Sequence, residues 1–378
     1  MRNCASSITN DGSLMIDRLG PRPDLSVIRE DVRAIEAYPV PSAVGFVKLD
    51  AMENPFSLPE GLQQQLGERL GKLALNRYPL SDPRGFKERL GKAVGLPAGM
   101  QLMLGNGSDE LIHLIILACA KPGTTVLAPA PSFVMYEMSA RFDHCNYVGV
   151  PLKENFALDS ERMLQAIAEH RPAVVFIAYP NNPTGNLFDR GGIDAILRAA
   201  PGIVVIDEAY LPFAQDTWMP LLKRTPNLLV LRTLSKLGLA GIRLGYLAGD
   251  TDWIEQFEKL RPPYNVNVLT LAAADLMLEN MSILDAQAGA LRSERGKLLS
   301  QLQATPGVRA FDSAANFILF RVANAGAVFA ALKQRGVLIK NVAPTHPLLA
   351  GCLRVTVGTV AENETFMKAL RESLGTGQ

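Results

Sequence analysis

Seven short apolar runs follow one another between residues 101 and 249, and the segments between them have the composition of helices. In two of these runs a long part, 173–178 in one and 202–206 in the other, is apolar throughout. A strand that is apolar on both faces is typical of a mostly parallel sheet with helices packed on each side. The runs occupy residues 101–105, 124–130, 145–152, 173–180, 202–210, 227–234 and 244–249. We therefore predict an α/β protein with a helix-covered, seven-stranded sheet.

The C-terminal third has a different pattern, which predicts a second and smaller domain. A long helical stretch runs from about residue 255 to 302, and strands are expected after it at 317–322, 336–341 and 353–359. We predict an N-terminal arm and part of the small domain over residues 1–57, and a large domain over 58–265. An interdomain helix and a C-terminal α+β domain are expected over 266–378.

The charge balance argues against a partner recognised by bulk electrostatics. Lys and Arg number 38 and Asp and Glu number 37, which gives a net charge of +1. Nucleic acid and anionic membranes are therefore not expected as partners. The four cysteines lack the spacing of a metal site or a disulfide framework, and the N-terminus lacks the apolar core of a signal peptide. We expect a cytoplasmic protein without a metal.

The run at 227–234 leads into a lysine that is a candidate nucleophile. Ser235 and Lys236 follow this run directly, and Arg243 comes seven residues after the lysine. A lysine held where a buried strand opens into a pocket loses part of its solvation, which makes its amine nucleophilic near neutral pH. A hydroxyl and a guanidinium beside it are suited to holding a phosphate. Most lysines after a strand are simply solvated, so this segment points to chemistry only in combination with others.

A glycine-rich segment at 105–110 is a candidate anion site. It follows the first run and begins an apolar helix, so free backbone amides are expected at Gly107 and Ser108. An ordinary capped helix start is the plainer interpretation. A dinucleotide-binding loop would need a further glycine where Glu110 stands, and a pyrophosphate would meet the charges of Asp109 and Glu110.

Polar side chains also follow two other runs. Asn182 begins an Asn-Pro-Thr-Gly turn, which in its plainer interpretation is only a turn. In the functional interpretation, Asn182 donates a hydrogen bond to a ligand oxygen at the edge of the sheet. Asp207 ends an apolar strand, where a carboxylate needs a partner such as a positively charged ring nitrogen. Tyr210 could then reach the phenolic oxygen of the same ring. A nucleophilic lysine, a phosphate clamp and a ring partner are what pyridoxal phosphate requires.

The order of these motifs resembles that of the fold type I pyridoxal-phosphate aminotransferases of class I and II over nearly the whole chain. The segments that carry the resemblance are 49–55, 77–83, 105–110, 179–185, 207–210, 233–246, 315–320 and 353–359. The resemblance implies a large sheet domain, a smaller α+β domain and pyridoxal 5′-phosphate as cofactor. It also implies a transamination in histidine biosynthesis. The amino donor would be histidinol phosphate, a phosphorylated amino alcohol, and the acceptor 2-oxoglutarate, a 2-oxo acid.

The resemblance implies a role for each motif residue by its position. Lys236 would bond the cofactor covalently and move protons, Asp207 would pair with the ring nitrogen, and Phe133 would stack on the ring. Asn182 and Tyr210 would bond the phenolic oxygen. The residues implied to surround the phosphate are Gly107, Ser108, Asp109, Ser235 and Arg243.

Further residues are implied to complete the site. Tyr78 would reach the same phosphate from the partner subunit of a homodimer. Arg354 would receive the anionic end of the substrate, and an arginine inside an apolar strand needs such a partner. The remaining candidates for the substrate pocket are Tyr38, Asn54, Asn316 and Lys340.

Three positions depart from the family pattern. Met52 stands where the family has an asparagine, which loosens the assignment on the substrate side. Seven residues separate Lys236 from Arg243 where the family often has eight, so the loop between them must take a shorter path. Lys340 stands where an arginine often helps to hold the substrate phosphate, and a lysine keeps the charge but loses the bidentate fork.

Other functions compete with this interpretation. An aromatic amino-acid aminotransferase or a threonine-phosphate decarboxylase would share the cofactor motifs. A non-catalytic, effector-binding protein of this fold usually carries an additional DNA-binding domain, for which the first 50 residues are too few and not basic enough. A nucleotide-dependent dehydrogenase would leave Lys236 and the turn at Asn182 without a role.

Overall fold

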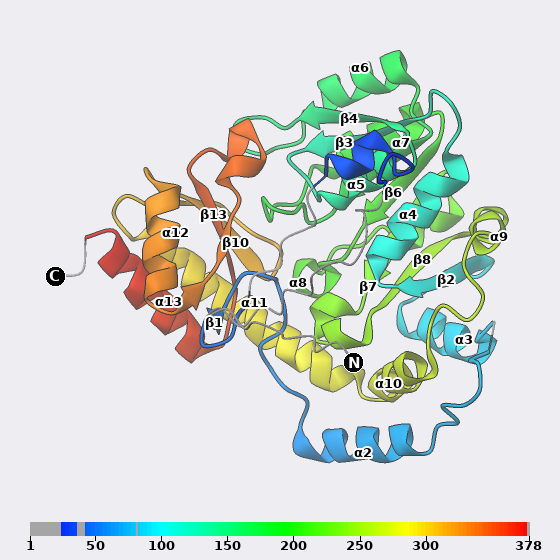
Figure 1. Cartoon of the computed structure of the whole chain (residues 1–378), viewed down its shortest axis with the longest axis horizontal. Coiled ribbons are helices and arrows are strands. Elements are labelled where there is room, and N and C mark those ends of the chain that lie inside the picture. Colours follow the sequence, from blue (N-terminus) through cyan, green and yellow to red (C-terminus); the bar gives the residue numbers. More distant parts are fainter. Residues whose placement is uncertain (1–23, 36–41, 81, 376–378) are drawn as a thin grey trace, which may run out of the picture. The chain divides into compact units, whose positions relative to one another are not determined.

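The computed structural model describes residues 24–35, 42–80 and 82–375. The chain divides into two compact units, residues 1–42 and 43–378. In the first unit, the described residues form the short helix α1 (Glu30–Arg33). The second unit contains the sheets and the remaining helices shown in Figure 1.

A seven-stranded sheet lies at the centre of the second unit, in the order β2-β8-β7-β6-β5-β3-β4. Its strands from β7 to β4 are parallel, and β8 runs antiparallel to both of its neighbours. Each of the seven apolar runs forms one of these strands, which confirms the predicted fold class. The strands are β2 (Met100–Asn106), β3 (Thr125–Ala130), β4 (Asn146–Pro151), β5 (Val174–Ala178), β6 (Ile203–Asp207), β7 (Leu228–Thr233) and β8 (Leu244–Asp250).

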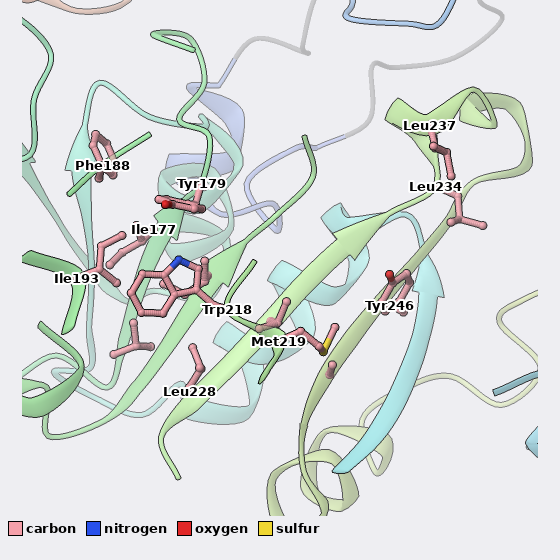
Figure 2. Packing of buried hydrophobic residues seen from close by; sticks show 14 of the residues in the cluster. Ile177, Tyr179, Phe188, Ile193, Trp218, Met219, Leu228, Leu234, Leu237 and Tyr246 are labelled. Atoms are coloured by element: carbon pink, nitrogen blue, oxygen red, sulfur yellow. The ribbon is translucent and has the colours of Figure 1, made fainter. Parts of the chain in front are cut away.

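Strand β5 explains why the central runs are apolar throughout. Val175 and Ile177 pack into one buried cluster, whereas Val174 and Phe176 belong to another. Because successive side chains of a strand point to opposite faces, the two clusters cover opposite sides of the sheet. Figure 2 shows part of the first cluster, in which Trp218 packs near Ile177 and Tyr179.

Helices contribute their apolar faces to these two clusters. The first cluster takes side chains from α2 (Glu60–Gly71), α3 (Arg84–Ala93), α6 (Ser160–His170), α7 (Arg190–Ala199) and α10 (Val268–Glu279). The second takes side chains from α4 (Ser108–Cys119), α5 (Met135–Phe142) and α9 (Thr251–Glu258). Both faces of the sheet are thus covered, and the edge formed by the carboxyl ends of β5, β6 and β7 is left for a site.

A second sheet and a third cluster form the C-terminal part. The sheet has the order β12-β13-β10-β9, and β1 pairs in parallel with β11. Leu49, which follows β1, joins Phe320 and Phe366 in the third cluster, so an N-terminal segment packs with the C-terminal part. The predicted domain bounds themselves stay a prediction. The elements are β1 (Val47–Lys48), β9 (Arg309–Ala310), β10 (Phe317–Arg321), α12 (Ala325–Gln334), β11 (Val337–Leu338), β12 (Lys340–Asn341), β13 (Cys352–Thr356) and α13 (Val360–Ser373).

The long helical stretch expected from residue 255 to 302 is wrong in detail, because it is broken twice. Helix α9 ends at Glu258, and the chain passes through Pro262 and Pro263, which lack the amide hydrogen that a helix needs. The side chain of Asn267 then caps α10 by accepting a hydrogen bond from the Thr270 amide. Helix α11 (Met281–Gln303) begins after a second break at Asn280. Within the described ranges, no helix is both long and apolar enough to cross a bilayer.

Candidate active site

A cavity opens at the edge where the central strands end. It holds about 590 Å³ of empty space, part of it open to solvent. Most residues singled out from the sequence meet here. The lining residues are Met52, Ser108, Asp109, Phe133, Ala178, Pro180, Asn182, Asp207, Ala209, Tyr210, Thr233, Ser235, Lys236 and Arg243. Tyr38 lies outside the described residues.

Lys236 enters the cavity from the short 3₁₀ turn η2 (Ser235–Leu237), which follows β7. Its Nζ donates a hydrogen bond to the carbonyl oxygen of Ala51 at 3.2 Å. Burial, reinforced by the positive charge of Arg354, lowers the pKa of Lys236 to about 8. The amine therefore loses its proton closer to neutral pH than the amine of an exposed lysine does.

Asp207 stands at the carboxyl end of β6 and is buried. Its Oδ1 accepts a hydrogen bond from the Ala209 amide at 3.0 Å, and its Oδ2 accepts one from the Tyr136 hydroxyl at 2.7 Å. Burial raises the pKa of Asp207 to about 6, although these two hydrogen bonds oppose the rise. Above that pH the cavity contains a carboxylate that can pair with a cation.

The loop between β2 and α4 packs closely against the residues that follow η2. Gly107 has a φ of 81° and caps α4, and a Cβ there would lie 2.7 Å from Nη2 of Arg243. A Cβ on Gly245 would lie 2.6 Å from the carbonyl carbon of Gly107. Arg243 also pairs with Asp109 at 3.5 Å, so the acidic side chain beside the loop is partly neutralised. The amides at the start of a helix, with a guanidinium beside them, make a site for an anion.

Arg354 and Asn182 are joined by a hydrogen bond. Nη1 of Arg354 donates to Oδ1 of Asn182 at 2.5 Å, and Nη2 donates to the carbonyl oxygen of Asp50 at 3.0 Å. Because Oδ1 is engaged by the arginine, the NH₂ group of Asn182 is the part that can donate to a ligand. Tyr210 also lines the cavity, and burial raises the pKa of its hydroxyl, which therefore stays protonated.

Three other predicted residues are not among the described residues that line the cavity. The amide of Asn54 donates to the Leu237 carbonyl oxygen at 3.3 Å and to Gln287 at 2.9 Å. Asn316 donates to the carbonyl oxygen of Met52 at 3.0 Å, and Lys340 is the register partner of Arg354 between β12 and β13. Their contacts to a substrate stay predictions.

Tyr78 is not among the described residues that line the cavity. Its side chain is 81% exposed, and its ring stacks on Tyr264 with 4.8 Å between ring centroids. The contact of Tyr78 with a phosphate in the site of a partner subunit stays a prediction.

From the sequence, Tyr136 has no predicted role in the site, and Met52 is only a departure from the family pattern. Tyr136, three positions after Phe133, bonds Asp207, and the only local signal was the aromatic character of that segment. Met52, noted as a departure, lines the cavity with a φ of 53°, a region that favours glycine or asparagine. Its amide donates to Oγ1 of Thr356, and its carbonyl oxygen accepts from Asn316.

Comparison with known proteins gives a consistent result. The family described as Aminotransferase class I and II matches residues 45–370. Histidinol-phosphate aminotransferase 1 of Ralstonia nicotianae is 57% identical over 353 residues, which cover 92% of this chain and 94% of the relative. Histidinol-phosphate aminotransferase 2 of Cupriavidus pinatubonensis is 56% identical over 353 residues, covering 92% and 96%.

A solved structure with the same fold includes a ligand. It is the histidinol-phosphate aminotransferase of Sinorhizobium meliloti in complex with pyridoxal-5′-phosphate. The likeness has a TM-score of 0.82 at 23% sequence identity and covers 93% of this chain and 98% of that chain. At this identity the likeness establishes the fold.

Proposed function

The chain belongs to the class I and II aminotransferase family, and we propose that it transfers the amino group of histidinol phosphate to 2-oxoglutarate with pyridoxal phosphate as cofactor. The family match confirms the membership predicted from the motifs. The amino donor is supported by the name histidinol-phosphate aminotransferase, which relatives 57% and 56% identical to this chain carry. The cytoplasmic location expected from the sequence remains a prediction.

The observation that carries this proposal is the position of Lys236 and Asp207 in one cavity with the anion-binding loop. Pyridoxal phosphate has an aldehyde, a ring nitrogen, a phenolic oxygen and a phosphate, and the cavity offers a partner for each. Lys236 suits the aldehyde, and Asp207 suits a positively charged ring nitrogen. The groups that suit the phosphate and the phenolic oxygen are Gly107, Ser108, Ser235, Arg243, Asn182 and Tyr210.

When bound, pyridoxal phosphate supplies an aldehyde that exchanges amines and a ring that accepts an electron pair. The side chains of this protein supply the rest. The neutral amine of Lys236 takes the proton from the substrate carbon that bears the amino group, since its lowered pKa suits a base near neutral pH. Asp207, ionised above pH 6, holds positive charge at the ring nitrogen. Phe133 offers its ring as a wall of the same cavity.

Arg354 is the residue that we expect to receive the anionic end of either substrate. Its side chain is buried, and its positive charge acts on both Lys236 and Tyr210, which line the cavity. Histidinol phosphate brings a phosphate and 2-oxoglutarate brings a carboxylate, and a guanidinium can bind both in a bidentate manner. Lys340 lies beside it in the strand register and adds a second cation suited to the doubly charged phosphate.

A panel of amino donors tests the proposed substrate. We expect kcat/KM for histidinol phosphate to exceed that for histidinol and for phenylalanine by a factor of about 10² or more, because only the phosphate forms charge-assisted bonds with Arg354 and Lys340. Histidinol is the matched control, since it differs by the phosphate alone. Equal kcat/KM for phenylalanine would point to an aromatic aminotransferase, and release of carbon dioxide from threonine phosphate would point to the decarboxylase.

We also propose a homodimer in which Tyr78 completes the site of the partner subunit. The support is a short segment with three exposed apolar side chains: Leu75, Tyr78 and Leu80 are 67%, 81% and 75% exposed. Contiguous exposed apolar residues mark surfaces that another molecule covers. A twofold dimer would bury this segment on both subunits at once.

Mixing two inactive variants tests the shared site. In a hybrid of Tyr78→Ala and Lys236→Ala subunits, both changes fall in one site and the other site is intact. An equal mixture that is unfolded and refolded together should therefore regain about a quarter of the wild-type activity. The control is a mixture of Lys236→Ala with Asp207→Ala, in which every site keeps a defect and no activity returns. A first mixture as inactive as the control would rule out the role of Tyr78.

A further inference from the structure

A tyrosine outside the described cavity lining bonds the carboxylate inside it. Tyr136 lies on α5, is fully buried, and stacks on Phe176 with 4.6 Å between ring centroids and 8° between ring planes. Its hydroxyl donates to Oδ2 of Asp207 at 2.7 Å. Because the ring is packed against Phe176, the position of the hydroxyl oxygen relative to Asp207 is fixed by packing.

In this pair Tyr136 is always the hydrogen-bond donor and Asp207 the acceptor. Burial raises the pKa of Tyr136 well above its usual range, and the charge of Asp207 adds to the rise. The phenol therefore stays protonated and acts only as a donor. A donor bonded to a carboxylate stabilises its ionised form, and such charge-assisted bonds are stronger than neutral ones.

The other charged neighbours of Asp207 act in the opposite sense. Asp109 on α4 and Glu208 next in sequence both raise the pKa of Asp207, as burial does. The Ala209 amide opposes them from the backbone, and Tyr136 opposes them from a side chain. Lys236 and Tyr210 share the cavity with Asp207. The hydroxyl of Tyr136 thus favours the ionised form of Asp207, and unlike the backbone amide it can be deleted by a substitution.

We propose that Tyr136 is a positioning residue that keeps Asp207 ionised and oriented for a cationic ring nitrogen of the cofactor. This inference rests on the proposed use of pyridoxal phosphate. Without this hydrogen bond the Asp207 carboxylate would be more basic. It would hold the proton that lies between it and the ring nitrogen more strongly, and the ring would then accept electrons from the substrate less readily. Tyr136 therefore acts on the reaction through Asp207, without touching substrate or cofactor.

The test compares cofactor binding by the wild-type apoprotein and the Tyr136→Phe variant across pH. Ionised Asp207 strengthens binding, so affinity for pyridoxal phosphate falls as pH drops through the pKa of that carboxyl. Without the hydroxyl this pKa is higher, and the fall should begin about one pH unit higher in the variant. The ionisations of the ligand are the same in both experiments, so the difference between the curves reports on the protein. We expect kcat/KM to drop about tenfold as well.

A matched control separates this effect from the loss of any buried tyrosine hydroxyl. Tyr179 is also buried and donates to a carboxylate, Oδ2 of Asp216, at 2.6 Å. Tyr179→Phe should leave the pH dependence of cofactor affinity where it is in the wild type. If Tyr136→Phe does not fold, 3-fluorotyrosine at position 136 keeps the shape and makes the hydroxyl a stronger donor, which should move the curve to lower pH.

The outcomes distinguish two failures. If the wild-type protein does not bind pyridoxal phosphate, the proposed function fails. If both proteins bind it and their pH curves coincide, the proposed function stands and the role of Tyr136 is refuted. An Asp207→Asn background gives a second check, because Tyr136→Phe should cause no further loss of affinity once the carboxylate is gone.

Discussion

The Lys236→Ala variant is expected to lose activity by a factor of about 10⁴ or more in kcat, because one substitution removes both the nucleophile and the proton carrier. Of the described residues that line the cavity, Lys236 alone has a primary amine, so no neighbour can take over. Steady-state rates with histidinol phosphate and 2-oxoglutarate measure the loss. Borohydride reduction of the loaded wild-type protein should attach the cofactor to the peptide that contains residue 236, and the variant should show no such label.

Misfolding is not expected to explain this loss. The amine of Lys236 makes one described hydrogen bond within the protein, at 3.2 Å, and burial opposes its charge. Its removal should leave the free energy of unfolding unchanged or slightly higher. Lys121→Ala, at an exposed position after α4, is the control for a general effect of losing a lysine. Near-normal transamination by Lys236→Ala, or a label at another lysine, would remove the basis of the proposed function.

The sequence predicts the central sheet well, because a strand that is buried on both faces appears in the sequence as a continuous run of apolar residues. Val174 to Ala178 are all apolar, since each of them contacts one of the two clusters. The helical stretch after residue 255 was predicted less well. Pro262 and Pro263 mark one break, but the break at Asn280 lacks both glycine and proline. The strand β9 has only two residues and is defined by its pairing with β10, which composition does not reveal.

The candidate site also contains residues that the sequence indicates and residues that it does not. Lys236, Asp207 and Gly107 stand at the ends of strands or the start of a helix, so their neighbours in sequence point to them. Tyr136 is 71 positions from Asp207, and only the packing of α5 brings them together. The carbonyl oxygens of Ala51 and Asp50, which accept from Lys236 and Arg354, carry no side-chain signature at all. Backbone acceptors and long-range pairs are therefore what sequence reasoning misses.

The Arg232→Met variant is expected to lower the free energy of unfolding by about 3–5 kcal/mol. Nε of Arg232 lies 2.9 Å from Oε2 of Glu208, and the two side chains are 6% and 0% exposed. Glu208 also accepts from the Trp218 amide at 2.5 Å and from Thr217. Methionine would fill much of the space of the arginine but would leave a buried carboxylate without a cation. Urea unfolding followed by tryptophan fluorescence, at a fixed protein concentration, measures the change.

The loss should depend on pH in a defined direction. Burial raises the pKa of Glu208, and the charge of Arg232 is the largest opposing influence. Without the arginine, the carboxyl of the folded protein binds a proton at higher pH than it does in the unfolded chain. The folded state then gains stability as pH falls through the raised pKa and loses it as pH rises. The difference between variant and wild type should therefore shrink from pH 8 to pH 6.

Two controls identify the unpaired charge as the cause. Arg335→Met removes a surface pair, in which Arg335 lies 3.2 Å from Glu372 and the side chains are 37% and 43% exposed. It should change the free energy of unfolding by less than about 1 kcal/mol. Adding Glu208→Gln to Arg232→Met should recover part of the loss, because the amide oxygen still accepts from Trp218 and no buried charge remains. An Arg232→Met loss no larger than that of Arg335→Met, or no recovery in the double variant, would mean that packing rather than charge holds this part of the sheet together.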